Sequence, residues 1–204
     1  GSVVKWQSST DAFATVTNDI TNTTNTLTFN NLAAGTYTYR AVVQNGSCAA
    51  ANSATVTITV NPAPVAGTVT ALDSTICATQ LYETLTLTGS SGSIQWQFSN
   101  NGGTSWSDIS AATATTYNAS ATGWYRAKVS GIAPCTPVFS NVVTLYVTPA
   151  SVGGSVASPA TVCAGSNSGT LTLSGQTGSV IKWQSSPDNA TWTDITNINT
   201  TYNY

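Results

Sequence analysis

One strand-like segment occurs three times in this chain at nearly constant spacing. It reads VVKWQSS, SIQWQFS and VIKWQSS where it begins at Val3, Ser93 and Val180. The tryptophans of the three copies, Trp6, Trp96 and Trp183, lie 90 and 87 residues apart. A repeat of this length is the size of a small domain, so we expect a tandem array of similar domains.

Other landmarks keep the same period and set the predicted boundaries. Tyr39-Arg40-Ala41 returns as Tyr125-Arg126-Ala127. The resulting register predicts repeats at residues 1–62, 63–149 and 150–204. Only the middle repeat contains every landmark, since the first lacks the front of the pattern and the third lacks the back. We therefore expect the sequence to be a segment of a longer protein.

Strict alternation of apolar and polar residues predicts the fold class. Leu85 and Leu87 alternate with threonines, and Tyr125 and Ala127 alternate with Trp124, Arg126 and Lys128. A period of two is typical of antiparallel strands with one buried face. About seven short strands in about 87 residues is the size of a β-sandwich, so we predict an all-β chain of tandem immunoglobulin-like repeats. The phase places five aromatic residues in the core: Trp6, Trp96, Trp183, Tyr39 and Tyr125.

The composition argues against several function classes. Only 6% of the residues are charged and the formal net charge is −2, so a nucleic-acid partner is not expected. No apolar run approaches the ~20 residues of a membrane helix, so we expect no membrane insertion in this segment. The chain has no histidine and its acidic residues are scattered, so neither a Ser-His pair nor a recurring carboxylate pair is present. We predict that the protein is not an enzyme and needs no cofactor or metal.

Four cysteines stand at positions that follow the repeat, which favours disulfides and an oxidising compartment. Our preferred pairing is Cys77 with Cys135 inside the middle repeat, with Cys48 and Cys163 bonded to cysteines outside this sequence. Closing a loop of nearly 60 residues would stabilise a domain by roughly 4 kcal/mol. The alternative pairs Cys48 with Cys77 and Cys135 with Cys163 across the junctions. Zinc is disfavoured because there is no CxxC pair and no histidine.

Trp124 is the best candidate for ligand binding. It is out of phase with the core residues of its strand and shares a face with Arg126 and Lys128. An exposed tryptophan beside two cations can stack on a sugar ring. The alternative is that a neighbouring strand covers this face and Arg126 lies over the indole.

Acidic residues in the loops raise the question of calcium. Asp11 and Asp188 each offer one carboxylate in a loop where the middle repeat has Asn100 and Asn101. Calcium wants six or more oxygen ligands, so we favour simple Asx turns. Asp108 and Asp194 recur at one repeat position, and for them we favour a hairpin role.

Several strings carry a family resemblance. KWQSS, YRAVVQNGSC and VCAGS resemble the tandem Ig-like repeats of giant secreted cell-surface proteins of the Bacteroidota. These include the flavobacterial gliding-motility adhesins exported by the type IX secretion system. The resemblance implies an extracellular location at the cell surface. Asp73-Ser74-Thr75 is similar to the O-glycosylation signal of that bacterial group, which implies a glycan on Ser74.

Taken together, these features predict a stalk or filament segment of a long extracellular surface adhesin. Its partners would be neighbouring repeats of the same chain and, beyond them, surface glycans or other copies of the filament. Two alternatives remain: a carbohydrate-binding or accessory module of a secreted glycan-degrading protein, and a self-assembling surface fibre.

Overall fold

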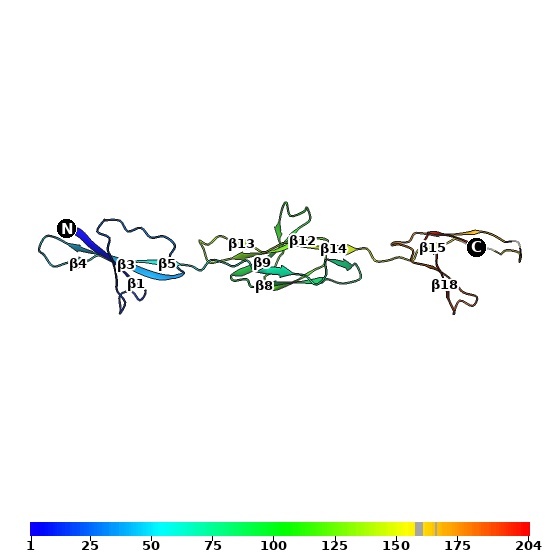
Figure 1. Cartoon of the computed structure of the whole chain (residues 1–204), viewed down its shortest axis with the longest axis horizontal. Helices are drawn as coiled ribbons and strands as arrows, with labels where there is room; N and C mark the ends of the chain where they lie inside the picture. The colour runs from blue at the N-terminus through cyan, green and yellow to red at the C-terminus, as the bar shows by residue number, and fades with distance from the viewer. Residues whose placement is uncertain (158–160, 166) are drawn as a thin grey trace. The chain divides into compact units, whose positions relative to one another are not determined.

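The computed structural model of the protein describes residues 1–157, 161–165 and 167–204. These residues form strands, turns and loops and contain no helix (Figure 1). The predicted fold class is confirmed: the chain is all-β and is built of Ig-like β-sandwich repeats. In the same described ranges, no helix has the length and apolar character that crossing a membrane requires.

Residues 1–62 form a single sheet. Its five strands are β1 (Ser2–Ser9), β2 (Asn18–Ile20), β3 (Gly35–Gln44), β4 (Ala51–Asn52) and β5 (Val56–Val60). The order is β2-β1-β3-β4, and β5 also pairs with β3. β3 is the central strand because it pairs antiparallel with β1 along its length and with β5 and β4 on its other edge. Its register sets Trp6 opposite Ala41 and Gln7 opposite Arg40.

The middle repeat contains nine strands in two sheets. They are β6 (Thr68–Thr70), β7 (Thr75–Cys77), β8 (Glu83–Thr88), β9 (Ser93–Ser99), β10 (Ser107–Asp108), β11 (Thr116–Ala119), β12 (Gly123–Ser130), β13 (Val138–Phe139) and β14 (Val143–Thr148). One sheet has the order β10-β9-β12-β14-β7, with β13 paired to β12, and the other has the order β11-β8-β6. Figure 1 shows the sheets as two layers, with β8 in one and β9 and β12 in the other.

The core of the middle repeat follows the predicted alternation. Along β12, the buried residues Tyr125, Ala127 and Val129 alternate with half-buried ones. Leu85 is 1% exposed and Trp96 is fully buried. The indole Nε1 of Trp96 donates a hydrogen bond of 2.9 Å to the carbonyl oxygen of Ala114, so its polar atom is satisfied inside the core.

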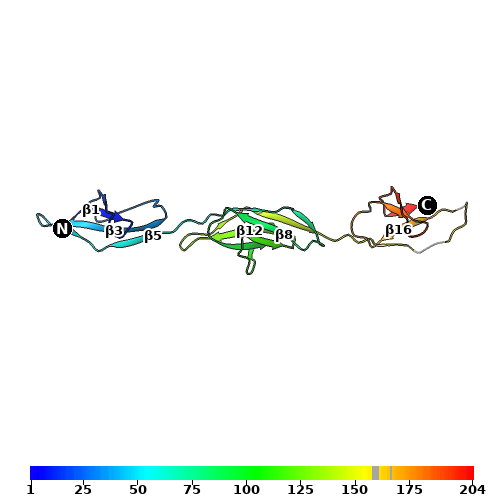
Figure 2. The same ribbon diagram turned by 90° about the horizontal axis from the view of Figure 1, so that it is seen from below.

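The described residues of the range 150–204 form five strands, β15 (Ser155–Val156), β16 (Thr170–Ser174), β17 (Trp183–Ser185), β18 (Thr193–Ile195) and β19 (Thr201–Asn203). β15-β16-β19 form one sheet and β17-β18 a second. Figure 2 labels β16 in this part of the chain. By sequence, β15, β16 and β19 correspond to β6, β8 and β11, and the β17-β18 hairpin corresponds to β9-β10.

The repeated tryptophans keep the same role in all three parts. The Nε1 atoms of Trp6 and Trp183 donate to the carbonyl oxygens of Thr24 and Asn199 at 3.0 and 2.9 Å, as Trp96 does to Ala114. Trp96 is fully buried and Trp183 is 9% exposed, whereas Trp6 is only half-buried. The other predicted core residues, Tyr39 and Tyr125, are buried.

The contacts of the chain group into two compact units, and the division between them crosses the middle repeat. One unit comprises Gly1–Thr70, Leu85–Tyr117 and Trp124–Val143, and the other comprises Ala71–Thr84, Asn118–Gly123 and Thr144–Tyr204.

Candidate functional site

The most organised group of polar side chains lies on the outer face of β9, β10 and β12. The strand register places Gln97 opposite Asp108 on one side and opposite Arg126 on the other. Cross-strand neighbours on one face of a sheet lie close enough for their side chains to interact. We call the connected side chains of Arg126, Gln97, Asp108 and Lys128 the outer ladder.

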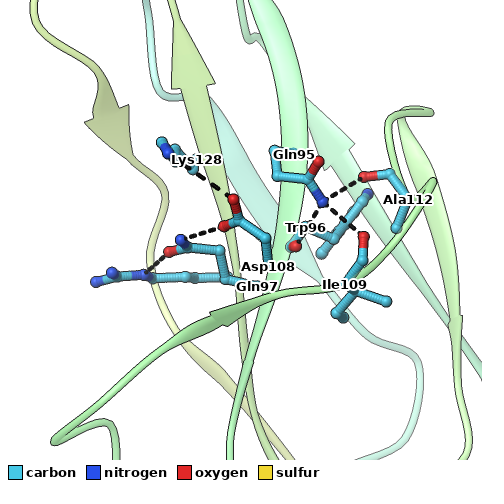
Figure 3. Close-up of polar contacts among 8 residues, drawn as sticks. Gln95, Trp96, Gln97, Asp108, Ile109, Ala112 and Lys128 are labelled. Atoms are coloured by element: carbon cyan, nitrogen blue, oxygen red, sulfur yellow. Dashed lines mark hydrogen bonds and ion pairs between the residues drawn. The ribbon is translucent and has the colours of Figure 1, made fainter.

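A neutral amide connects the charges of the outer ladder. Arg126 Nε donates to Gln97 Oε1 at 2.8 Å, and Gln97 Nε2 donates to Asp108 Oδ1 at 2.6 Å. Lys128 Nζ lies 4.0 Å from Asp108 Oδ2. Figure 3 shows the links from Lys128 to Asp108 and from Asp108 to Gln97. The ladder therefore ties three strands together through side chains in addition to the backbone ladder.

The guanidinium of Arg126 also contacts two aromatic rings. Its Cζ atom lies 4.1 Å from the ring centre of Trp106 and 4.0 Å from that of Phe139. Burial lowers the pKa of Arg126 from its ordinary value, but an arginine remains charged at neutral pH. Both rings attract that charge through their negative faces. Arg126 is thus occupied by the protein's own side chains.

This geometry shows how the predicted ligand-contact residues lie, and binding of a ligand by them stays a prediction. Trp124, Arg126 and Lys128 do lie on one face of β12, all half-buried. Arg126 stacks on Trp106 and Phe139, however, and not on Trp124 as the alternative reading expected. The sequence pattern identified the shared face but could not show which rings cross from neighbouring strands.

The first repeat contains the same ladder. Arg40 Nε donates to Gln7 Oε1 at 2.8 Å, Gln7 Nε2 donates to Asp19 Oδ1 at 2.8 Å, and Lys5 Nζ lies 2.6 Å from Asp19 Oδ2. Hydrogen bonds from Lys5 and then from Gln7 hold the pKa of Asp19 below its ordinary value. Arg40 stacks on a single ring, that of Phe13, at 4.0 Å.

The third part of the chain holds the ladder without an arginine. Gln184 Nε2 donates to Asp194 Oδ1 at 2.8 Å, and Lys182 Nζ lies 2.7 Å from Asp194 Oδ2. These hydrogen bonds, with that from Lys182 the stronger, lower the pKa of Asp194. Trp192, which corresponds to Trp106, is 52% exposed. The recurring Asp108 and Asp194 are therefore hairpin residues, and the missed signal was the glutamine that follows each repeated tryptophan.

The acidic loop residues form turns. Ser9 Oγ donates to Asp11 Oδ1 at 2.6 Å, and the backbone N–H of Thr15 donates to Asp11 Oδ2 at 2.7 Å. Hydrogen bonds from the side chains of Ser9 and Thr15 hold the pKa of Asp11 well below its usual range. For Asp188 the backbone N–H groups of Thr191 and Ala190 have the same effect.

The middle repeat keeps this turn with an amide. Ser99 Oγ donates to Asn101 Oδ1 at 2.8 Å, and the backbone N–H of Ser105 donates to the same oxygen at 3.0 Å. These are the contacts of an Asx turn, in which the side-chain oxygens accept from the loop itself. In the described parts of the chain, no three His, Cys, Asp or Glu side chains gather as metal ligands do.

The cysteines do not form the predicted Cys77–Cys135 bond, while bonds of Cys48 and Cys163 to cysteines outside this sequence stay a prediction. All four are free thiols, so neither the preferred Cys77–Cys135 bond nor the alternative pairing of Cys48 with Cys77 and Cys135 with Cys163 is formed. Cys77 ends β7 in register with Thr148, and a hydrogen bond from the Thr79 hydroxyl lowers the pKa of its thiol. Cys135 Sγ lies 3.7 Å from the carbonyl oxygen of Pro62 and 3.9 Å from that of Asn61. The two thiols have different neighbours because β7 pairs with the end of β14, whereas Cys135 follows β12.

Ser74, the residue implied as a glycan acceptor, is exposed in the loop before β7. Its backbone carbonyl accepts a hydrogen bond of 2.8 Å from the N–H of Tyr146. The loop backbone is thereby held while the residue itself faces solvent, and the glycan stays a prediction.

Comparisons with known proteins place the chain in a sequence family. A family described as "Domain of unknown function (DUF8696)" matches it three times, over residues 1–62, 65–149 and 152–204. No curated protein matches. Among solved structures, the crystal structure of the chicken CNTN1 FN1–FN3 domains aligns with 99% of this chain and 78% of its own. Its sequence identity is 15% and its TM-score 0.30, so the fold assignment rests on the sheets themselves.

Proposed function

The chain belongs to the DUF8696 family through three consecutive matches, and from that premise we propose that it is a structural segment of a long extracellular surface protein. In this proposal the repeats form a stalk or filament of a bacterial surface adhesin of the gliding-motility type. Their task is to bear mechanical load and to set how far the stalk extends from the cell, without catalysis.

The parallel pairing of β7 with β14 supports a load-bearing role. β7 lies near the beginning of the middle repeat and β14 at its end, and they pair with Tyr146 opposite Thr75 and Thr148 opposite Cys77. Tension applied at the two ends of the repeat pulls parallel strands past each other. All the hydrogen bonds between them are then loaded together rather than broken one at a time.

Backbone and side-chain bonds reinforce this pair. Tyr146 N donates to Ser74 O and Ala78 N donates to Thr148 O, both at 2.8 Å. Thr148 Oγ1 adds a bond of 3.2 Å to the carbonyl oxygen of Ile76. This pairing at the ends of the repeat is the observation that carries the proposal.

The outer ladders support the same role. In two repeats the arginine, glutamine, aspartate and lysine of the ladder bond to one another and link three strands. Side chains arranged to fasten a sheet suit a mechanical element better than a binding cleft. The low charge content, 6% of residues, suits close spacing of many such repeats.

Pulling the chain from its two ends in a force spectrometer tests the proposal. The middle match spans residues 65–149, so its unfolding should appear as one event that lengthens the chain by about 300 Å less the folded length. Tyr146→Pro removes the N–H that bonds to Ser74 and should lower the unfolding force.

Tyr82→Pro is the matched control, because Tyr82 is also an exposed tyrosine but lies outside the strands. An unfolding force that is the same for Tyr146→Pro and the unaltered chain would overturn the load-bearing role.

Location and sugar binding need separate measurements. Antibody labelling of intact producing cells should detect the repeats at the surface, and labelling only after lysis would contradict the proposal. On a glycan array the chain should bind no sugar through Trp124. The Trp124→Ala variant should therefore give the same signals as the unaltered chain. A signal that this variant loses would favour the carbohydrate-binding alternative instead.

A further inference from the structure

The loop that joins β9 to β10 in the middle repeat contains an asparagine followed by a glycine, Asn101-Gly102. Gly102 and Gly103 have φ angles of 74° and 79°, in the left-handed region that glycine adopts without strain. Asn101 and Gly102 are exposed, and a Cβ added to Gly102 would meet no atom within 4 Å. The pair is therefore open to water, and no side chain shields the backbone nitrogen of Gly102.

An asparagine in such a pair can react with the backbone nitrogen that follows it, because the two groups belong to one short segment. Gly102 N forms a bond to Asn101 Cγ and loses its proton, while the bond from Cγ to Nδ2 breaks and the nitrogen leaves as ammonia. The product is a five-membered succinimide ring. Water then opens the ring at Cγ to give aspartate, or at the backbone carbonyl carbon of residue 101 to give isoaspartate.

The hydrogen bonds of the loop treat the two carbonyl groups of Asn101 differently. The side-chain oxygen Oδ1 accepts from Ser99 Oγ at 2.8 Å and from the N–H of Ser105 at 3.0 Å. The backbone oxygen accepts from Thr104 Oγ1 at 2.9 Å and from the N–H of Thr104 at 3.5 Å. Donors aimed at a carbonyl oxygen stabilise the negative charge that develops there during attack. The better-placed pair of donors lies at Oδ1, which favours attack at Cγ in both steps.

The first repeat shows how the same turn holds a carboxylate. Ser9 Oγ donates to Asp11 Oδ1 and Thr15 Oγ1 donates to Asp11 Oδ2, both at 2.6 Å. Ala12, which follows this aspartate, has a φ of 57°, so its backbone is left-handed as in the middle repeat. Asp188 accepts from two hydroxyls in the same way. This turn therefore suits an aspartate wherever one is present.

The middle repeat has a hydroxyl ready for the new oxygen. Ser105, like Thr15 in the first repeat, is the fourth residue after the Asx residue. Its Oγ accepts from Asn101 Nδ2 at 2.8 Å. A hydroxyl can donate as well as accept, so it can donate to the oxygen that replaces Nδ2. Aspartate thus keeps the bonds of the turn, whereas isoaspartate lengthens the backbone within it.

We propose that Asn101 is a site of spontaneous deamidation and that its turn directs the product to aspartate. The middle repeat would thereby acquire the carboxylate that the other two repeats have at this turn. Water is the only co-reactant. This inference does not depend on the load-bearing role, because it concerns the chemistry of one loop.

Incubation of the 204-residue chain at mildly alkaline pH, followed by peptide mapping, tests the proposal. Mapping is needed because Asn45 also precedes a glycine. At position 101 we expect aspartate to be the main product in the folded chain, and isoaspartate to be the main product in the same chain unfolded in urea. An Asn101 that stays intact in the folded chain, or equal product ratios in the two samples, would overturn the proposal.

Gly102→Ala tests the ring closure. The added methyl group has free space and the first repeat accepts alanine at the equivalent left-handed position, so the variant should keep the circular dichroism spectrum of the unaltered chain. The methyl group hinders the nitrogen that attacks Cγ, and deamidation of Asn101 should slow at least about tenfold. A variant that deamidates as fast as the unaltered chain would contradict attack by this nitrogen.

Two substitutions with opposite expected effects test the direction of ring opening. Ser99→Ala removes a donor to Oδ1 and should lower the ratio of aspartate to isoaspartate about two- to threefold, since an exposed turn gains less from a donor than a closed active site does. Thr104→Ala removes the hydroxyl donor to the backbone oxygen and should raise the ratio.

Ser105→Ala is the matched control for these substitutions. It removes a hydroxyl from the same turn but keeps the N–H that donates to Oδ1, and the succinimide has no Nδ2 for that hydroxyl to contact. The product ratio should therefore stay that of the unaltered chain. Equal ratios in all three variants would show that the turn does not direct the product.

Discussion

The middle repeat and residues 150–204 share strand sequences but bury them to different degrees. Leu85 and Leu87 are 1% and 3% exposed, whereas Leu171 and Leu173 are half-buried. Trp106 lies under Arg126, whereas Trp192 is 52% exposed. The comparison shows that alternation along a strand sets which residues can be buried, while the opposing strands decide how far they are.

The first and middle repeats also differ in which residue supplies the ring beneath the ladder arginine. In the first repeat this ring belongs to Phe13, which has a φ of 64° in the left-handed region. The middle repeat has Gly103 at that position, with a φ of 79°, and a Cβ there would lie 3.3 Å from the ring of Trp106. The ring of Trp106, three residues after Gly103, thus occupies the space that the Phe13 side chain takes in the first repeat. The position of the ring is kept although the sequence position is not.

The largest difference is expected for the core tryptophans. Trp96→Ala should lower the free energy of unfolding of the middle repeat by about 3–5 kcal/mol, because a fully buried ring leaves a cavity. Trp6→Ala should cost the first repeat less, since Trp6 is half-buried. Urea titration followed by amide exchange in β12 and β3 measures the two losses separately. Equal losses would mean that the first sheet is as well covered as the middle sandwich.

Replacing the ladder arginines should have a smaller effect. Arg126→Lys loses the Nε donor to Gln97 and the stacking on two rings, which should cost about 1–2 kcal/mol. Arg40→Lys loses the same donor but the stacking on one ring only, so it should cost less. Phe139→Leu removes one ring from the middle repeat, and in that background Arg126→Lys should cost about as much as Arg40→Lys. If Arg126→Lys and Arg40→Lys lower the free energy of unfolding equally in the otherwise unaltered chain, the second ring contributes nothing to stability.

Lowering the pH should destabilise the turn at Asp11 in the first repeat and not the corresponding turn at Asn101 in the middle repeat. The pKa of Asp11 is lowered on folding, so its contribution is fully present above the unfolded value of about 4 and is lost as the pH falls through the folded pKa. The turn of the middle repeat contains Asn101, which does not titrate. Amide exchange of Thr15 and Val16 should therefore lose protection below pH ~4 relative to that of Ser105. Asp11→Asn should abolish the difference, and a difference that persists in this variant would show that another group is responsible.

The smallest effect is expected from a reducing agent. Because all four thiols are free, dithiothreitol should leave the urea midpoint of the middle repeat unchanged. Mass spectrometry after alkylation of the folded chain should find the exposed thiols of Cys48, Cys77 and Cys163 modified, and that of the half-buried Cys135 modified more slowly. A loss of 2 Da with a reductant-sensitive midpoint would restore the disulfide prediction.

The strands and the core tryptophans were accessible from the sequence because both depend on local rules. Side chains on a strand alternate between two faces, so Tyr125, Ala127 and Val129 had to share one face. The threefold occurrence of KWQ-like segments made the same inference possible in each part of the chain. The candidate site was predicted only in part: Arg126 and Lys128 were recognised, whereas Gln97 and the rings of Trp106 and Phe139 were not.

What the sequence by itself determined, then, is the period, the all-β class and the face on which each side chain lies. The tertiary structure decided which strands meet. It paired β7 with the end of β14, which gives Cys77 and Cys135 different neighbours, and it placed Trp106 and Phe139 against Arg126. The physical reason is that alternation is set by the backbone of one strand, whereas register and thiol pairing depend on segments that are distant in sequence and are joined only by packing.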